Sequence, residues 1–444
     1  MRPLTKSWRG QGIKSVVFLD DGIAAQNTKK LTKNAAEKIE SDLTRAGFTI
    51  NKEKSDLIPK QKRKWLGVII DTKSMSFYVP EEKIIKLKQE ITKTLSQKTS
   101  TPKELAKLAG TLSSMHMAIG PSVRLFTRSM YRQIACAASW HQRILLTQGT
   151  IEQLSFWLEN IEYVNGCTFK HRPTTTQMVF SDASQDGYGG FTVHKLQRLI
   201  CSGKFTASEM KESSTYREIL AVKLVLQSYG KMLNNQEIQI NMDNFGATRI
   251  LTIGSSKEPL QKLSMDIFFH CLQNNIKITC KWIPRELNYD ADYLSKIGDT
   301  DSWGVDKDTF HYINRKFGPF SVDRFADDRN KKLKAFNSRY YCPGTAHVNT
   351  FTADWSDENN WLCPPVSLIG STLKHLRLCK GRGTLLIPVW ASAYFWPLIY
   401  PDGSHPAPFI KDVLVVDPYY ESYGEDSAFN GHVTFQTIAL QLQF

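Results

Sequence analysis

The sequence predicts a multidomain protein of the α/β and α+β classes, from its length and from the order of its apolar segments. A chain of 444 residues is long enough for about three domains. In the middle third, strand-like and helical stretches follow one another in the order strand, strand, strand, helix, strand, helices, strand, helix. The strands are expected at residues 178–182, 187–193, 198–206, 238–242 and 276–283. This order indicates a mixed β/α domain in the centre of the chain.

The first third of the chain opens with a short β run at residues 16–19, which ends in the paired acids Asp20 and Asp21. An amphipathic helix is expected over residues 31–46, with Gly47 as its end. Taken alone, two aspartates after a strand usually mark a turn.

The segment after this helix carries Lys54 and a strand expected at residues 64–70. Together with the paired acids, this order resembles the second half of a reverse transcriptase palm. The resemblance implies a partial palm over residues 1–80, with Asp20 and Asp21 as metal ligands. It also implies contacts to nucleic acid from Lys54, Leu66 and Gly67.

Residues 81–170 are expected to form a helical thumb and connection. Thr101 and Pro102 begin one of its helices, with proline at the first helical position. Only 19 residues precede Asp20, too few for an upstream strand, a crossover and fingers. We therefore predict that this chain does not polymerise DNA by itself. The remaining palm and thumb are expected to hold an RNA–DNA hybrid through its shape and backbone.

Four acids of the middle third lie at the boundaries of expected elements. Asp182 ends the first strand, Glu218 lies in the first turns of a helix, and Asp243 ends the strand at residues 238–242. Asp292 lies in an Asn-x-x-Ala-Asp-x-Leu run that follows the last strand. Any one of them alone would be read as an ordinary solvated acid. Converging carboxylates, in contrast, are tolerable only around a cation. Two Mg²⁺ ions about 4 Å apart could then clamp a phosphodiester, and Mn²⁺ is expected to substitute.

The element order and the four acids together resemble the type 1 ribonuclease H fold over residues 176–298. The resemblance implies a mixed five-stranded sheet with helices. It also implies that Asp182, Glu218, Asp243 and Asp292 are the catalytic and metal-binding residues. Ser184 and Asn244 are expected to contact the hybrid, as is the loop at residues 187–190, whose glycines a tight hairpin would explain equally well. Many family members carry a histidine before the last aspartate, whereas residues 282–286 here contain none. Turnover is therefore expected to be slower, or another group to help.

Residues 300–444 form a third block, with a strand expected at 321–326 and another at 383–390. Their pattern resembles the Dam-type adenine-N6 methyltransferase-like domain of DIRS-like (tyrosine-recombinase) retrotransposons, which follows a reverse transcriptase and a ribonuclease H. In that family an Asn or Asp, two prolines and an aromatic residue bind the flipped base. This chain has Cys363 and Val366 at the outer two positions. We therefore expect a degenerate domain without S-adenosylmethionine chemistry.

Composition agrees with a nucleic-acid partner. The formal charge is +14, from 57 Lys and Arg against 43 Asp and Glu, and a basic chain attracts polyanions. The basic cluster at residues 60–64 could contact a nucleic-acid backbone or direct nuclear import, and a solvated turn explains it equally well. The eight cysteines show no zinc spacing, which favours an intracellular protein of the nucleus or cytoplasm. Prolines 388 and 397 interrupt the apolar stretch 385–400, which argues against a membrane span.

These observations predict Mg²⁺-dependent hydrolysis of the RNA strand in RNA–DNA hybrids. Two alternatives stay open. The chain could be a non-catalytic nucleic-acid-binding relic of a retrotransposon polyprotein, or a methyl-transfer enzyme centred on Asp323 and the two prolines at 364 and 365. Intact carboxylates favour the nuclease over both.

Overall fold

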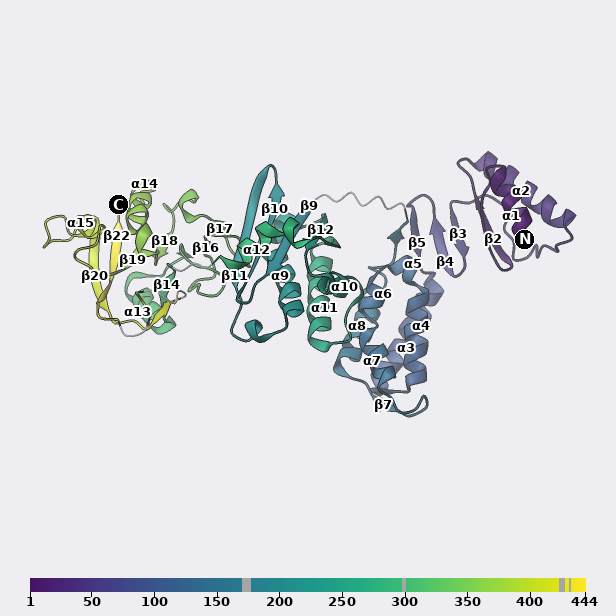
Figure 1. Cartoon of the computed structure of the whole chain (residues 1–444), viewed down its shortest axis with the longest axis horizontal. Coiled ribbons are helices and arrows are strands. Elements are labelled where there is room, and N and C mark those ends of the chain that lie inside the picture. The colour runs from purple at the N-terminus through teal and green to yellow at the C-terminus, as the bar shows by residue number, and fades with distance from the viewer. Residues whose placement is uncertain (170–176, 298–300, 423–427, 431–432) are drawn as a thin grey trace. The chain divides into compact units, whose positions relative to one another are not determined.

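The computed structural model describes residues 1–169, 177–297, 301–422, 428–430 and 433–444 (Figure 1). The chain divides into two compact units. One comprises Met1–Pro173 with Ile253–Ser256, and the other comprises Thr174–Thr252 with Lys257–Phe444. The expected boundaries at residues 170, 176, 298 and 300 lie outside the described residues. The expected class, a mixed α/β multidomain protein, is confirmed by its two five-stranded mixed sheets and the helices around them.

The first unit begins with a hairpin of β1 (Lys14–Phe18) and β2 (Asp21–Ala25), which α1 (Arg2–Gly10) precedes and α2 (Lys29–Arg45) follows. The hydroxyl of Thr28 accepts the N–H of Leu31 and caps α2. Gly47 has φ +79° just beyond the helix, the left-handed conformation that ends many helices. The expected β run and amphipathic helix are therefore present, and β2 pairs with the β run in a hairpin.

The prediction of one continuous strand at residues 64–70 is wrong, because this segment forms two strands joined by a turn. Residues Leu66 (φ 45°) and Gly67 (φ 77°) form a tight turn between β3 (Lys62–Trp65) and β4 (Val68–Asp71). Positive φ at both central positions matches the twist of a two-residue hairpin, and glycine adopts it without strain. These strands belong to a four-stranded sheet completed by β5 (Ser76–Tyr78) and β8 (Cys167–Thr168).

A helical part follows, as expected. Its longest helices are α3 (Glu81–Gln97), α4 (Pro102–Ser114) and α8 (Gln148–Asn160). A capping box starts α4, because the hydroxyl of Thr101 accepts the N–H of Glu104 and the Glu104 carboxylate accepts the N–H of Thr101. The apolar stripe of α4 is buried, as its spacing predicts.

The second unit is built around a five-stranded sheet in the order β11-β10-β9-β12-β13. Its strands are β9 (Gln177–Ala183), β10 (Gly187–His194), β11 (Gln197–Lys204), β12 (Glu237–Met242) and β13 (Lys277–Trp282). The first three run antiparallel, whereas β12 is parallel to both β9 and β13. This mixed sheet is the one that the ribonuclease H resemblance implies.

Helices cover this sheet. The helix α9 (Ser214–Tyr229) is apolar on most of its circumference and contributes seven buried apolar side chains to the core. The short helix α12 (Tyr289–Lys296) lies against β10 and β9. A Cβ on Gly189 would collide with the backbone of Ser295 in α12, and one on Gly187 would come within 2.8 Å of the Ser295 carbonyl. The glycines of β10 therefore let α12 approach the sheet closely.

The C-terminal part of this unit has a second five-stranded mixed sheet, in the order β15-β18-β19-β22-β20. Its strands are β15 (Val322–Asp323), β18 (Asn359–Leu362), β19 (Arg382–Pro388), β20 (Ile410–Val416) and β22 (Thr437–Gln443). The strand expected at residues 321–326 is shorter than predicted, because the chain turns after Asp323. That carboxylate accepts the backbone N–H of Lys332 at 3.0 Å and holds the turn. No helix of the described residues is long and apolar enough to cross a membrane.

Candidate active site

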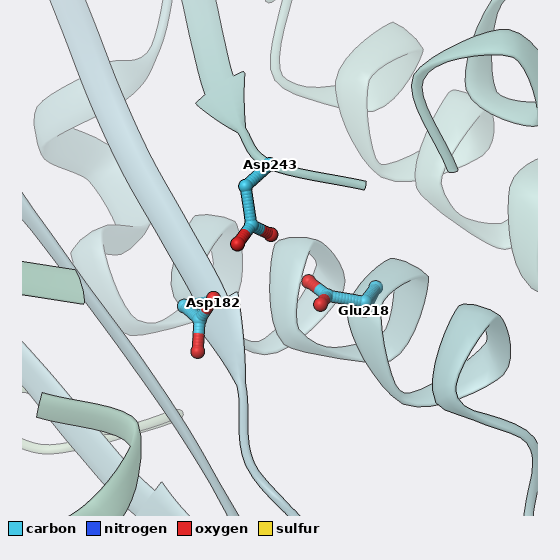
Figure 2. A group of neighbouring side chains, drawn as sticks. All are labelled: Asp182, Glu218 and Asp243. Atoms are coloured by element: carbon cyan, nitrogen blue, oxygen red, sulfur yellow. The ribbon is translucent and has the colours of Figure 1, made fainter. Parts of the chain in front are cut away.

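Three carboxylates converge at one edge of the sheet β11-β10-β9-β12-β13. Asp182 lies near the end of β9, Glu218 in the second turn of α9, and Asp243 directly after β12. One oxygen of each lies within 4.8 Å of the others, and Figure 2 shows the three side chains extending into the same space. Because β9 and β12 are adjacent and parallel, their carboxyl ends meet at one edge of the sheet. This is the one group of three or more metal-type ligands among the residues that the structure describes.

Burial makes this cluster electrostatically costly. Asp182 is 4% and Glu218 is 8% exposed. Burial, and next the charges of Asp182 and Asp243, raise the pKa of the Glu218 carboxyl to about 9. Burial also raises the pKa of Asp182 to about 6, although a hydrogen bond from Ser295 opposes the rise. Both shifts arise because desolvation and like charges disfavour the ionised form.

The donor set fits a hard divalent cation. All three ligands are carboxylate oxygens, the atoms that Mg²⁺ and Mn²⁺ prefer. Glu218 Oε2 is buried and has no hydrogen-bond partner among the described residues. A buried carboxylate oxygen without a donor is unfavourable unless a cation supplies the missing interaction.

Asp182 is oriented by two polar groups that the sequence analysis did not single out. Ser295 Oγ donates to Asp182 Oδ2 at 3.0 Å, and Asn288 Nδ2 reaches Asp182 Oδ1 at 3.4 Å. Both residues are buried. Asn288 directly precedes α12 and Ser295 lies in its last turn, so they stand on either side of Asp292 in the chain. The signal was present in the sequence, because positions 288, 292 and 295 are spaced to share one face of a helix.

We expect Ser295→Ala to weaken divalent-metal binding by roughly 10- to 100-fold, because the partner that orients a metal ligand is lost. Calorimetric titration with Mn²⁺ measures the change. The matched control is Ser202→Ala, since the Ser202 hydroxyl donates to the Leu294 carbonyl of the same helix at 2.9 Å rather than to an acid. Equal Mn²⁺ affinity of the wild type and Ser295→Ala would contradict a positioning role.

Asp292, the fourth predicted ligand, lies outside the three-carboxylate group. Arg285 Nη2 donates to its Oδ1 at 2.9 Å, and the ammonium of Lys296 binds its Oδ2. Partial burial would raise the pKa of Asp292, but the hydrogen bonds from Lys296 and Arg285 outweigh it and lower the pKa. The carboxylate is near enough to raise the pKa values of Asp182 and Glu218. The structure thus places Asp292 beside the cluster and pairs it with two cations.

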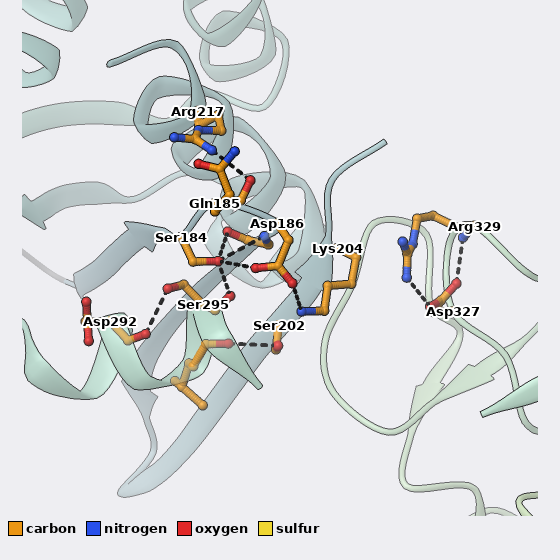
Figure 3. A network of polar contacts seen from close by, with 12 residues as sticks. Ser184, Gln185, Asp186, Ser202, Lys204, Arg217, Asp292, Ser295, Asp327 and Arg329 are labelled. Atoms are coloured by element: carbon orange, nitrogen blue, oxygen red, sulfur yellow. Dashed lines mark hydrogen bonds and ion pairs between the residues drawn. The ribbon is translucent and has the colours of Figure 1, made fainter. Parts of the chain in front are cut away.

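The two predicted nucleic-acid contacts of this domain have internal partners. Ser184 Oγ lies 2.7 Å from the Ser295 carbonyl and 3.0 Å from the N–H of Gly187, so it ties the β9–β10 turn to α12 (Figure 3). Asn244 Oδ1 accepts the N–H of Ala247 at 2.9 Å near the start of α10 (Phe245–Ile253). A neighbour that the sequence analysis missed is Trp282, whose indole N–H donates to the Asp243 carbonyl at 2.9 Å.

The predicted residues of the first unit form no comparable group. Asp20 and Asp21 are exposed at the tip of the β1–β2 hairpin. Neither belongs to a three-ligand cluster within the described part of the chain. Lys54 and Leu66 are also exposed, and Gly67 lies in the turn described above.

The C-terminal sheet borders a cavity of about 510 Å³, whose wall includes Arg324, Asn337 and Pro365 together with Lys204 of β11. Arg324 is 4% exposed and donates to Asn360 Oδ1 at 2.6 Å and Asn337 Oδ1 at 2.9 Å. Cys363 is buried, and its thiol lies 3.6 Å from the Trp303 carbonyl in the core. The thiol is therefore engaged in the core around Trp303.

Comparison with known families finds one match near the N-terminus and another in the C-terminal third of the chain. The family model "Reverse transcriptase (RNA-dependent DNA polymerase)" matches residues 1–70. The model "DNA N-6-adenine-methyltransferase (Dam)" matches residues 295–403. YfdM of Escherichia coli (strain K12), whose assignment as a methyltransferase is provisional, is 36% identical over 78 residues, which are 18% of this chain and 76% of YfdM. Through this domain the chain belongs to the Dam methyltransferase family.

A second curated relative is matched over a smaller share of its length. The DNA N-6-adenine-methyltransferase of Haemophilus phage HP1 is 35% identical over 74 residues, 16% of this chain and 39% of the phage protein. Among solved structures, a foamy viral protease-reverse transcriptase with an RNA/DNA hybrid is 17% identical, with a TM-score of 0.32, over 63% of this chain and 37% of the viral one. LC11-RNase H1 with an RNA/DNA hybrid is 22% identical, with a TM-score of 0.21, over 27% of this chain and 94% of that one.

Proposed function

We propose that this chain is a metal-dependent nuclease that hydrolyses the RNA strand of RNA–DNA hybrids. The observation that carries the proposal is the convergence of Asp182, Glu218 and Asp243, with a buried Glu218 oxygen that lacks a protein donor. The reverse transcriptase-like segment at residues 1–70 and the basic net charge agree with a nucleic-acid substrate.

In this mechanism the chain's own residues bind and orient. Asp182, Glu218 and Asp243 would hold the divalent cations, and Asp292 would complete the set for a second ion. When bound, the cations lower the pKa of the attacking water and stabilise the departing 3′ oxygen. Ser295 and Asn288 keep the Asp182 carboxylate in its orientation, and Trp282 fixes the backbone at Asp243.

Selection of RNA over DNA would come from contacts to consecutive 2′-hydroxyls in the minor groove of the hybrid. Asn244 directly follows Asp243 in the chain and is only partly buried, which makes it a candidate for such a contact. The reverse transcriptase-like segment would help to hold the hybrid. We propose no polymerisation by this chain alone, because Asp20 and Asp21 lack a third ligand within the described residues.

Cleavage of a labelled RNA–DNA hybrid in Mg²⁺ tests the proposal. RNA-strand cleavage that depends on Asp243 and spares the DNA strand supports it. A folded protein that binds the hybrid without cutting it would instead be a nucleic-acid-binding relic. A DIRS-like retrotransposon origin, with action in the nucleus or cytoplasm, remains part of the same proposal.

Methyl transfer is a second candidate, because the chain belongs to the Dam family. We propose that this activity is lost, since Cys363 replaces an Asn or Asp acceptor and Val366 replaces an aromatic face. No transfer of labelled methyl groups from S-adenosylmethionine to DNA is therefore expected. The phage HP1 enzyme serves as the positive control, and methyl incorporation above background would contradict the loss.

A further inference from the structure

Asp292 is held on both of its oxygens. Arg285 Nη2 binds Oδ1 at 2.9 Å, and the Lys296 ammonium binds Oδ2. The carboxylate side chain is only 15% exposed, whereas the side chains of Arg285 and Lys296 are 70% and 53% exposed. Two solvent-exposed cationic side chains therefore cover the largely buried carboxylate of Asp292, which lies beside the three-carboxylate group.

Both cations come from the short segment that carries Asp292. Arg285 begins the 3-10 turn Arg285–Leu287 after β13, and Lys296 is the last residue of α12, one helical turn beyond Asp292. Arg285 also lies in the stretch, residues 282–286, that contains no histidine although many proteins of the ribonuclease H family carry one before the last aspartate. The segment thus offers guanidinium and ammonium groups at the rim of the site.

The two cations satisfy Asp292 without a metal. Asp182, Glu218 and Asp243 lie near enough for their negative charges to oppose a fourth free carboxylate. The carboxylate of Asp292, followed by those of Asp243 and Asp182, raises the pKa of the Arg285 guanidinium. A divalent cation bound by Asp292 would compete with these ion pairs for the same two oxygens. In the absence of nucleic acid, the pairs and the metal compete for the same oxygens.

We propose that Arg285 and Lys296 form a cation clasp that keeps Asp292 from metal until a nucleic-acid phosphate draws the two cations away. This inference rests on the proposed nuclease function and concerns the regulation of its metal site. The free protein then loads one ion through Asp182, Glu218 and Asp243. A second ion binds tightly next to Asp292 only when the hybrid is present.

The two ion pairs compete with a divalent cation for Asp292, and a nucleic-acid phosphate can still break them. Exposed ion pairs contribute little and are screened by salt, so a polyanion can take them over. A guanidinium binds phosphate through paired hydrogen bonds, which gives Arg285 a favourable new partner. Release of the clasp would then tie completion of the metal site to the presence of substrate.

The test counts Mn²⁺ ions bound to the full chain, by electron paramagnetic resonance of free Mn²⁺. Without nucleic acid, the wild type is expected to bind one ion tightly. The Arg285→Gln/Lys296→Gln variant is expected to bind a second ion at about tenfold lower Mn²⁺ concentration than the wild type does, since two competing pairs are gone. A hybrid made resistant to cleavage by 2′-fluoro substitution is expected to induce the second ion in the wild type.

The matched control is Arg198→Gln/Lys277→Gln, which removes the same charge from the same domain. Arg198 pairs with Asp290 of α12 at 2.9 Å, and Lys277 pairs with Glu237 at the opposite end of β12 and β13. This control is expected to bind Mn²⁺ like the wild type. Adding Asp292→Asn to the clasp variant is expected to remove the second ion, which assigns that ion to Asp292.

Two results would overturn the clasp: a wild type that binds its second ion as tightly without nucleic acid as with the hybrid, or a clasp variant that binds Mn²⁺ like its control. Failure of the nuclease itself looks different. In that case Asp243→Asn leaves Mn²⁺ binding unchanged from the wild type, and the wild type does not cut the hybrid. One ion that depends on Asp243, with no effect of the clasp variant, would leave the nuclease and remove only the clasp.

Discussion

Asp243→Asn is expected to abolish Mg²⁺-dependent cleavage of the RNA strand, with a loss of about 10³-fold or more in rate, because several kcal/mol of charge stabilisation depend on the bound cation. Asparagine keeps the shape of the side chain and its place after β12. It removes one negative charge from a cluster whose only cation-binding atoms are carboxylate oxygens. The measurement is single-turnover cleavage of a hybrid labelled on either strand.

The control for this change is Asp290→Asn, which removes an equal charge from α12. Asp290 is exposed, pairs with Arg198 and does not belong to the three-carboxylate group. We expect its cleavage rate to stay within a few-fold of the wild type, since exposed pairs contribute about 1 kcal/mol or less. Cleavage retained in Asp243→Asn would disprove the assignment of this cluster as the catalytic centre.

Gly189→Val is expected to cost about 3 kcal/mol of unfolding free energy and to remove metal binding at the same time. Any side chain at this position of β10 would collide with the backbone of Ser295 and Leu294, and overpacking of this kind costs about 1–3 kcal/mol. The helix α12 would have to move away from the sheet. Its contacts through Ser295 to Asp182 and Ser184 would be lost with it.

Urea unfolding and Mn²⁺ titration of the same samples measure the two effects of Gly189→Val. Gly110→Ala is the control, because a Cβ at this position of α4 meets no atom within 4 Å. Alanine there is expected to be neutral or slightly stabilising, since it favours helix more than glycine does. A Gly189→Val protein with wild-type stability and Mn²⁺ affinity would show that close packing of α12 is not required.

Much of the central domain was predictable from local patterns. Strand and helix periodicity located Asp182, Glu218 and Asp243 at element ends, and adjacent parallel strands bring such ends together. The capping box at Thr101 and the helix end at Gly47 were equally readable, because both depend on contacts within a few residues. The turn at Leu66–Gly67 was misread as strand, since apolar residues on both sides of a two-residue turn resemble one continuous run.

The glycines of β10 show where local reasoning ended. A hairpin or a substrate loop explained them equally well from the sequence, but they make room for a helix about a hundred positions away in the chain. Ser184 looked like a contact to nucleic acid, and its hydroxyl joins two parts of the same domain. In both cases the partner is distant in sequence, so no local pattern could identify it.

The sequence by itself determined the fold class, the Dam-like and reverse transcriptase-like segments, and three acids at the correct ends of their elements. The fold class and the positions of the acids follow from periodicity and short motifs, which are local, whereas the two segments were identified by their resemblance to known families. Only the tertiary structure decided that Asp292 is paired with Arg285 and Lys296 while Asp182 is held by Ser295 and Asn288. Those pairings depend on how α12 packs against β9 and β10, because that packing sets which charges lie within a few ångströms of one another.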